Sequence, residues 1–363
     1  MATYNLATTY EKKLDERFRT KSYTDRFTGH GYDFLGKNAI KLWTVDDITM
    51  NDYAPTGTLG SRLGTMQELG DELNTYTLTQ FKSIRATYEK SKDMDQDNIH
   101  KRSDLIKNFN DRVLLPAIDK YRLDKWAAGC GQAKTMTASL SKTNIIETIL
   151  AGNAMLDNAW VPLEGRVAFI SVTDSIKVNL ADELKYADKY IEKGAVRGEV
   201  AELGGLHIVR IPDALMPAGV KILIKQASTT VDPRVLDYLH EFPQVEGYFG
   251  PVINGVFRYD AFVLAQKANG IIAIADDATK ICADPVVAVS SSKMAITSTT
   301  SGAVIKYSVD GSNPKAEGKG TTYSAAVNLP ASGTVVKAYA EKDGLATSGV
   351  VAYKYNGTDF DKL

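Results

Sequence analysis

DQDNIHKRSDLIKNFNDRVLLPAIDKYRLDKWAAGC, residues 95–130, is the stretch around which we expect the rest of the chain to fold. Its apolar side chains recur at steps of three and four residues, which indicates the buried face of a long α-helix. Asp95 and Asp97 place negative charge at the helix N-terminus, and Gly129 supplies the stop. About 30 helical residues would make a rod roughly 45 Å long, which Pro116 should bend. The predicted stripe contains Ile99, Leu105, Ile106, Phe109, Val113, Ala117, Tyr121 and Trp126.

The composition of the 363 residues is that of a soluble globular protein with about two domains. The 43 basic and 44 acidic residues nearly cancel, which argues against tight nucleic-acid binding through phosphate contacts. Two cysteines give no disulfide framework, so the reducing cytosol is the expected place of folding. The charged N-terminus lacks the apolar core of a signal peptide, and the longest apolar run, residues 271–275, is too short to cross a bilayer. We therefore expect no membrane partner.

The first quarter of the chain predicts extended structure rather than a core. Residues 1–38 are polar, which fits a solvated helix or arm, or an extended arm that becomes ordered on a neighbouring subunit. Alternating side chains predict a strand within residues 39–53, and Thr and aromatic residues predict another at 74–81. Between them, PTGTLGSRLG at residues 55–64 predicts a flexible loop. The result is a projecting hairpin, which needs other structure to lie on because two strands alone are marginally stable.

The middle of the chain, residues 141–275, mixes helices and strands irregularly, which favours an α+β fold over a doubly wound sheet. Ser141 or Thr143 suits the N-cap of the first helix, and Pro233 suits the first turn of the last. Gly204-Gly205 predicts a tight hairpin turn. Helices are expected at residues 145–155, 180–191 and 233–242, and strands at 165–172, 200–203, 206–211, 220–225, 256–264 and 270–275.

The C-terminal part, residues 285–355, shows no helical period and consists of short alternating runs. Ile305, Tyr307 and Val309 fall on one face of such a run, and Lys306 falls on the other. Turn residues recur about every 8–12 positions, as is typical of a small β-sandwich. We expect this part to be an independent module.

Motifs for nucleotide or metal binding are incomplete. GYDFLGKN at residues 31–38 nearly matches a phosphate-binding loop, but Asn38 offers no hydroxyl for magnesium. The acidic DMDQD at residues 93–97 begins like a calcium loop, but Asn98 stands where the turn needs glycine. These carboxylates suit the cap of the long helix instead.

No other set of residues predicts chemistry. Cys130, after a Trp-Ala-Ala run, is expected to be a small apolar filler. None of the histidines stands at metal-ligand spacing from another; they are His30, His100, His207 and His240. We therefore predict no catalytic, cofactor-binding or metal-binding residues, no cofactor and no enzymatic activity, which is weak support for a structural role.

The order of four segments resembles the major capsid proteins of tailed bacteriophages with the HK97-type fold. The segments are AIKLWTVDDITMNDY (39–53), TYTLTQFKSIRATYEKSKDMDQDN (75–98), DRVLLPAIDKYRLDKW (111–126) and GVFRYDAFVLAQKANGI (255–271). The resemblance covers roughly residues 1–276. It implies an α+β fold with an arm, an extended loop that reaches over a neighbour, a peripheral domain with a long spine helix, and an axial domain near the symmetry axes.

The resemblance divides the chain into seven parts. The first three are an N-terminal arm (1–38), a strand with the extended loop (39–83) and a peripheral domain with the spine helix (84–159). An axial domain (160–255), return strands of the peripheral domain with a linker (256–284), an immunoglobulin-like β-sandwich (285–356) and a tail (357–363) follow.

The implied function is self-assembly, as hexamers and pentamers, into an icosahedral head that encloses double-stranded DNA. The protein would then belong to the virion and assemble in the host bacterial cytoplasm. Its implied partners are copies of itself, portal, scaffold or decoration proteins, and packaged DNA through weak non-specific contact. Some members of this family join subunits through a lysine and an asparagine. Lys82 lies near the loop, but nothing in the sequence pairs it with an asparagine, and we predict no such bond.

Three segments of the C-terminal part resemble immunoglobulin-like modules of phage surfaces and the small β module that ends some carbohydrate-active enzymes. They are IKYSVDGSNP (305–314), TTYSAAVNL (321–329) and VVKAYAEKDGLATS (335–348). An outward-facing module with host-surface glycans as partners through residues 285–356 is one implication. Exposed tyrosines would serve such contacts, but a place in the core is the favoured interpretation for most of Tyr307, Tyr323 and Tyr339.

Two other classes of protein stay open on the sequence. The first is a carbohydrate-binding or hydrolytic protein with a C-terminal β module, which would need paired carboxylates, and Glu199 and Glu202 are candidates by proximity. The second is a monomeric adhesin. Both alternatives predict a monomer, whereas the capsid interpretation predicts large assemblies.

Overall fold

The computed structural model describes residues 22–29, 39–45, 50–53, 55–56, 62–63, 66, 71–87, 107–136, 138–181, 199–243, 250–275 and 279–363. The chain divides into two compact units. The smaller unit is residues 34–78, and the larger unit combines residues 1–33 with 79–363.

In the smaller unit, β1 (Ala39–Val45) pairs with β2 (Asp71–Thr77) in an antiparallel ladder from Ala39 opposite Thr77 to Val45 opposite Asp71. The predicted hairpin is therefore confirmed. The predicted second strand at 74–81 is wrong in extent, because it is split at residues 78–79 between β2 and β3 (Gln80–Thr87). Each part pairs with a different partner, so one run of β-forming residues serves two sheets.

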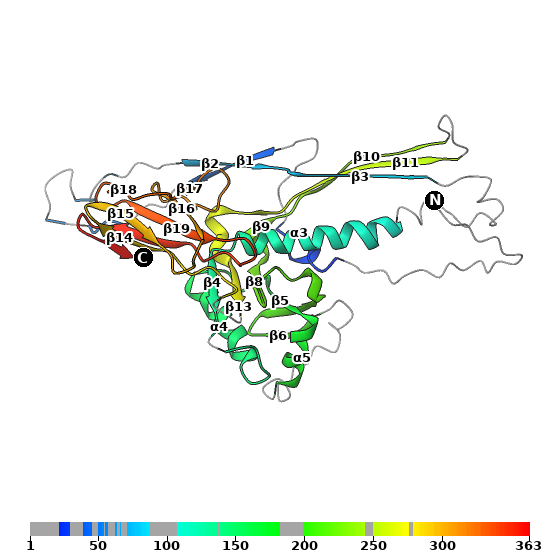
Figure 1. Cartoon of the computed structure of the whole chain (residues 1–363), viewed down its shortest axis with the longest axis horizontal. Helices are drawn as coiled ribbons and strands as arrows, with labels where there is room; N and C mark the ends of the chain where they lie inside the picture. The colour runs from blue at the N-terminus through cyan, green and yellow to red at the C-terminus, as the bar shows by residue number, and fades with distance from the viewer. Residues whose placement is uncertain are drawn as a thin grey trace, which may run out of the picture. The chain divides into compact units, whose positions relative to one another are not determined.

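The centre of the larger unit is a mixed six-stranded sheet in the order β4–β13–β8–β5–β7–β6 (Figure 1). β13 runs parallel to β4, β5 runs parallel to β7, and the remaining neighbours are antiparallel. The predicted Gly204-Gly205 hairpin joins β6 to β7, and both glycines have positive φ. The strands are β4 (Gln132–Thr135), β5 (Arg166–Ser171), β6 (Glu199–Leu203), β7 (Leu206–Ile211), β8 (Ile222–Gln226) and β13 (Ile271–Ala275).

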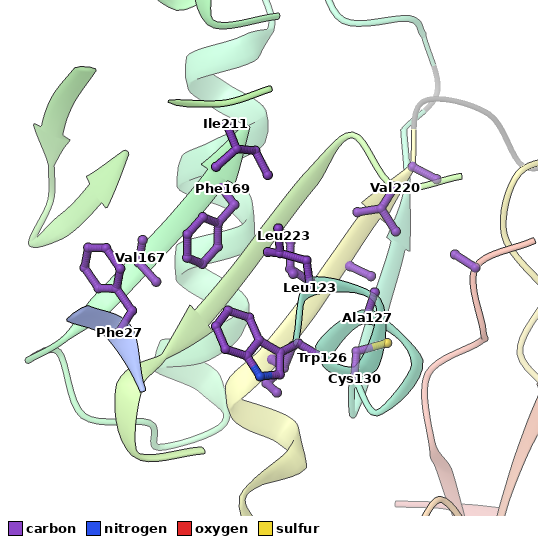
Figure 2. Packing of buried hydrophobic residues seen from close by; sticks show 14 of the residues in the cluster. Phe27, Leu123, Trp126, Ala127, Cys130, Val167, Phe169, Ile211, Val220 and Leu223 are labelled. Carbon is purple, nitrogen blue, oxygen red and sulfur yellow. The ribbon is translucent and has the colours of Figure 1, made fainter. Parts of the chain in front are cut away.

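Alternate side chains of this sheet belong to two separate cores, because successive residues of a strand point to opposite faces. On β5, Val167 and Phe169 join the cluster that contains Trp126 of the long helix, as Figure 2 shows. The neighbours Ala168 and Ile170 join the cluster formed with α4 (Ile145–Asn158) and α5 (Val172–Leu180). Helices thus cover both faces, which explains why β5 and β13 read as uninterrupted apolar runs.

The long helix is confirmed from residue 107 to α3 (Leu115–Ala128), and its predicted start near residue 95 lies outside the described residues. Residues 110–114 form a π-helical turn directly before Pro116. An inserted residue of this kind rotates everything that follows around the helix axis. The predicted stripe is wrong at Val113 and Ala117, which are exposed, while Leu114 and Ile118 are buried.

A three-stranded antiparallel sheet in the order β10–β11–β3 also belongs to the larger unit (Figure 1). Its strands are β10 (Arg234–Phe242), β11 (Val252–Tyr259) and β3. The predicted helix at 233–242 is therefore wrong. A bulge between Leu236 and Tyr238 shifts the register against β11, so the strand loses the strict alternation that would reveal it. A short pair, β9 (Thr230–Val231) with β12 (Phe262–Val263), precedes and follows these strands.

One further prediction for the middle of the chain needs correction, and another is not tested. The N-cap of α4 is Asn144, not Ser141 or Thr143, and its Oδ1 accepts a hydrogen bond from the Ser141 backbone N–H at 2.7 Å. The helix predicted at 180–191 falls almost wholly on residues that the structure does not describe, and it stays a prediction. The structure adds a helix that the sequence analysis did not predict, α5, at Val172–Leu180 with Ser171 as its N-cap. Residues 182–198 lie outside the described residues.

The C-terminal part has two sheets, in the orders β14–β15–β18 and β17–β16–β19–β20–β21. Both contribute to one core, which confirms the predicted all-β sandwich. Tyr307 lies in this core, Tyr323 packs against it, and Tyr339 is buried, so the favoured interpretation of the tyrosines is confirmed. The strands are β14 (Val286–Ser290), β15 (Lys293–Thr297), β16 (Val304–Ser308), β17 (Thr321–Thr322), β18 (Val327–Asn328), β19 (Val335–Glu341), β20 (Val351–Tyr355) and β21 (Phe360–Lys362).

Candidate assembly surfaces

Residues 22–29, which we name the arm anchor, are bonded to α3 by a buried carboxylate. The Oδ1 atom of Asp119 accepts hydrogen bonds from the Ser22 hydroxyl at 2.7 Å and the Thr24 hydroxyl at 2.6 Å. Its Oδ2 atom accepts from the Tyr23 backbone N–H at 3.0 Å. A buried carboxylate with three donors is well satisfied, and each bond to a charged group is worth more than a neutral one. The position of the segment on the helix is therefore fixed.

One turn further along α3, Arg122 extends the same network. Its guanidinium donates to the Thr24 hydroxyl at 2.9 Å, pairs with Asp25, and donates to the Asp232 carbonyl at 3.2 Å. The Asp232 carboxylate in turn accepts the Trp126 indole N–H at 2.9 Å. One set of polar contacts inside the larger unit thus joins the arm anchor, the long helix and the β9 segment.

Lys225 completes this network from the sheet side. Its ammonium nitrogen donates to the Phe27 carbonyl at 2.9 Å and the Thr230 hydroxyl at 2.5 Å, and it lies 3.6 Å from the centroid of the Trp126 ring. Burial lowers the pKa of Lys225 to about 7; Arg122 also lowers it, and Asp232 opposes both by favouring the charged form. Lys225 therefore holds the arm anchor over the aromatic core of the sheet.

The arm anchor also enters the core and extends a short sheet. The Phe27 ring packs edge-on against Phe169 at 5.8 Å between centroids. Gly29 donates its N–H to the Thr230 carbonyl at 3.0 Å, and a Cβ added to it would come within 2.4 Å of that oxygen. Only glycine allows this approach. Residues 22–29 of the N-terminal arm predicted at 1–38 are therefore held against the larger unit, and the rest of that arm lies outside the described residues.

The chain re-enters the larger unit at a second fixed point, next to the predicted extended loop. Thr79 donates to Asp260 Oδ2 through its backbone N–H at 2.7 Å and its hydroxyl at 2.8 Å. The Tyr121 hydroxyl of α3 donates to Asp260 Oδ1 at 2.8 Å. Burial, with the Asp260 charge beside it, raises the pKa of Tyr121 to about 12, so this phenol stays a donor at neutral pH.

Four of the described loop residues of the smaller unit have large apolar side chains that are exposed. Met50, Tyr53, Leu63 and Met66 all present large side chains to solvent in the single chain. Clusters of exposed large apolar groups mark surfaces that bind other proteins. The Gly-rich tip predicted at 55–64 lies mostly outside the described residues.

The β module packs on the end of α3 through Lys315. Its buried ammonium nitrogen donates to the Cys130 carbonyl at 2.6 Å, the Ser348 carbonyl at 2.8 Å and the Thr347 hydroxyl at 2.9 Å. Thr347 donates to the Ala128 carbonyl at 3.2 Å. These donors satisfy carbonyls at the negative end of the helix. Burial lowers the pKa of Lys315. The C-terminal β module therefore supplies part of the C-terminal cap of α3, through Lys315 and Thr347.

Residues 346–350, which we name the docking loop, bond the module to the edge of the six-stranded sheet. The Val350 N–H donates to the Gly131 carbonyl at 2.9 Å, next to β4. The Ala346 N–H donates to the Lys280 carbonyl at 2.9 Å, and the Ala346 carbonyl accepts from the Cys282 N–H at 2.9 Å. The docking loop is therefore bonded to the chain directly before β4, which is an end strand of that sheet.

The remaining sequence candidates do not come together. Glu199 and Glu202 fall on β6, the outermost strand of its sheet. Lys82 is exposed on β3 opposite Phe257. Cys130 is buried, as the filler interpretation expects, although its Sγ also lies 3.6 Å from Lys315 Nζ. Within the described ranges no group of three or more His, Cys, Asp and Glu could hold a metal ion. The same residues contain no helix long and apolar enough to span a membrane.

Sequence reasoning missed the charged residues that do the anchoring. The sequence analysis assigns no role to Asp119, Arg122, Lys225 or Lys315, whose charged groups the structure encloses. One signal was available for Lys225, because it stands alone in the apolar strand ILIKQ (222–226). A charge at an inward position of such a strand indicates a buried partner.

Solved structures share the architecture of about three quarters of the chain. A structure titled Mycobacterium phage Che8 matches 75% of this chain and 98% of its own, with 17% identity and a TM-score of 0.58. The capsid structure of cyanophage P-SCSP1u matches 75% and 93%, with 14% identity and a TM-score of 0.59. The mature capsid of bacteriophage PhiM1 matches 74% and 91%, with 12% identity and a TM-score of 0.54. No curated protein matches this chain in sequence.

The C-terminal part matches a different family. The model described as Fn3 associated covers residues 294–355, which lie within the β-sandwich. The part of the chain that precedes the β module therefore has the HK97-type fold of bacteriophage capsids, and the module itself is immunoglobulin-like.

Proposed function

We propose that this chain is the major capsid protein of a tailed bacteriophage, which self-assembles as hexamers and pentamers into an icosahedral head enclosing double-stranded DNA. The observation that carries the proposal is the fold, shared with solved phage capsids over 74–75% of the chain. It is supported by the hydrogen bonds that join residues 22–24 of the predicted arm, and Thr79 at the end of the predicted loop, to side chains of α3. Such anchoring suits segments that bear load against neighbouring subunits.

In this proposal the parts keep the boundaries expected from the resemblance. The arm is residues 1–38, the strand and extended loop 39–83, the peripheral domain 84–159 with return strands at 256–284, the axial domain 160–255, and the module 285–356. The near-zero net charge suits close packing of identical subunits, because like-charged copies would repel. Many modest contacts become a stable shell through multivalency.

The proposed partners follow from the same assignment. Copies of the chain form the shell, portal and scaffold or decoration proteins join it, and packaged DNA touches it weakly. The module faces outward, where host-surface glycans are its candidate ligands. Assembly takes place in the bacterial cytoplasm and the product is the virion.

The test is the size of the purified protein in solution. Light scattering after size-exclusion chromatography, with negative-stain microscopy of the same fractions, should find capsomers, tubes or shells. A protein that stays at 39.6 kDa over a wide range of concentration and salt would contradict the proposal. That result would favour the alternative of a carbohydrate-binding protein with a C-terminal β module, which glycan-array binding would then identify.

A further inference from the structure

Trp160, between α4 and β5, combines two costly features. Its side chain is 94% exposed, although tryptophan is among the most strongly buried residues on average. Its φ is 57°, in the left-handed region that a bulky L-residue rarely adopts. Glycine or asparagine would serve this helix end better, since either tolerates that conformation. Neither feature stabilises the single chain.

The backbone around Trp160 is nevertheless held firmly. Arg166 is fully buried, and its guanidinium donates to the carbonyls of Val161 and Pro162, the latter at 3.0 Å. The same group donates to Asn153 Oδ1 and Asp157 Oδ1, both at 2.7 Å. One buried cation thus fixes the loop that carries Trp160 to the end of α4. The exposed indole is therefore presented on a rigid loop.

The surroundings of Trp160 define a small acidic and apolar patch. Leu163 is 58% exposed in the same loop. The Asp157 side chain is 53% exposed, and Glu164 is exposed as well. A rigid, exposed tryptophan with an apolar neighbour is the usual composition of a binding hot spot, because little entropy is lost when it docks. Asp157 is already paired with Arg166, so the charge that favours a positively charged partner surface is that of Glu164.

The chain itself carries a complementary surface on β3. Phe81 is 55% exposed, and the Arg258 guanidinium lies 5.9 Å from the centroid of its ring. Arg85 is exposed, and alternation along the strand puts it on the same side as Phe81. This face offers an aromatic ring with Arg258 beside it, and with Arg85 four residues further along β3, to an indole that has a carboxylate nearby. Arg–Trp stacking and charge pairing can form together.

We propose that the Trp160–Leu163 loop of one subunit binds the Phe81–Arg85 face of β3 on a second copy of this chain. The two surfaces differ, so the contact is head-to-tail and builds rings or lattices rather than a closed dimer. The inference rests on the proposed function, in which many copies of the chain assemble. It explains why an unfavourable backbone conformation and an exposed indole are found on one rigid loop.

The test uses the full chain with Trp160→Asn. Because asparagine tolerates positive φ, the melting temperature of the unassembled subunit should rise by about 1–3 °C. The concentration needed for assembly should rise about tenfold or more, because a hot-spot side chain is lost. Ser291→Asn is the matched control: Ser291 has φ 50° and is exposed in the β14–β15 turn, so the melting temperature should rise while assembly stays unchanged.

Phe81→Ser tests the other side of the contact and should weaken assembly to a similar degree. The double variant should be little worse than either single one, since both remove the same contact. Normal assembly of Trp160→Asn, or a melting temperature below that of the parent, would overturn the inference. Normal assembly of Phe81→Ser would overturn the assignment of β3 as the docking face. If the unmodified chain itself fails to assemble, the proposed function is at fault.

Discussion

Lys225→Met should change how the stability of the subunit depends on pH. The ammonium group of Lys225 is enclosed by the arm anchor, α3 and β9, and the charged groups around it are Asp232 and Arg122. Burial favours the neutral amine in the folded protein, whereas the unfolded chain keeps its proton to higher pH. A folded-state pKa below the unfolded value means that stability is lost as the pH falls toward 7 and recovered as it rises.

The size of the effect follows from the two pKa values. Between a folded value of about 7 and an ordinary value of 10.5, the unfolded chain binds up to one more proton than the folded chain. Raising the pH from about 7 to 9.5 should therefore increase the unfolding free energy by about 3 kcal/mol through this residue alone. Methionine keeps much of the volume and cannot titrate, so the variant should lack this rise.

The assay is denaturant unfolding at several pH values, followed by tryptophan fluorescence, since Trp126 lies against Lys225. The unfolding free energy of the parent should rise with pH relative to that of the variant, from about pH 7 to 9.5. Lys221→Met serves as control, because Lys221 is 41% exposed at the side chain and its removal should leave the pH dependence unchanged. Parallel pH curves for the parent and Lys225→Met would show that Lys225 is charged in the fold and refute the reasoning.

Three further substitutions probe the anchoring contacts. Asp119→Ala leaves three donors of the arm anchor without an acceptor, so it should lower the unfolding free energy measured in denaturant by about 2–4 kcal/mol and speed proteolysis near residue 22. The control Asp124→Ala, on the exposed side of α3, should lower it by less than about 0.5 kcal/mol. Lys315→Met should speed hydrogen exchange of the docking-loop amides about tenfold or more. The control Lys306→Met, on the module surface, should leave their exchange unchanged. Equal exchange rates of these amides in the two variants would contradict the helix-capping role of Lys315. Gly29→Ala forces a Cβ to 2.4 Å from a β9 carbonyl oxygen and should cost about 1–3 kcal/mol in the same unfolding assay, so unchanged stability would refute the close approach.

Local patterns predicted the strands that are buried on both faces. Residues 167–170 within GRVAFISV and residues 271–275 are apolar throughout, because each strand contributes to two cores. The Gly204-Gly205 turn was equally clear, since two positive φ values leave few alternatives. The alternating runs of the module predicted its sandwich for the same reason: one face of each strand is apolar and the other is polar.

Predictions failed where one extra residue changed the phase of a pattern. The π-helical turn at 110–114 rotates the following face of the long helix, so Val113 is exposed although it matches the 3.6 period. The bulge between Leu236 and Tyr238 has the same effect on β10, which consequently read as a helix. Neither insertion changes composition, and both depend on contacts with distant segments.

Buried charge was the other source of error. Asp119 is buried because donors from residues 22–24 reach it, almost a hundred positions earlier in the chain. Lys315 is buried because the end of α3 offers unpaired carbonyls. Such partners belong to tertiary structure, and a single sequence gives little sign of them. The assembly surfaces depend on these contacts, so they could be proposed only from the structure.

The most direct measurement is cryo-electron microscopy of particles formed by the full chain after expression in bacteria. The account predicts closed shells in which identical subunits sit around five-fold and six-fold positions, each with residues 22–29 bonded to α3. It also predicts that the β module lies outside the shell, held at the end of α3 by Lys315. A preparation that contains only folded single chains at high concentration, or an assembly without five-fold or six-fold positions, would contradict it.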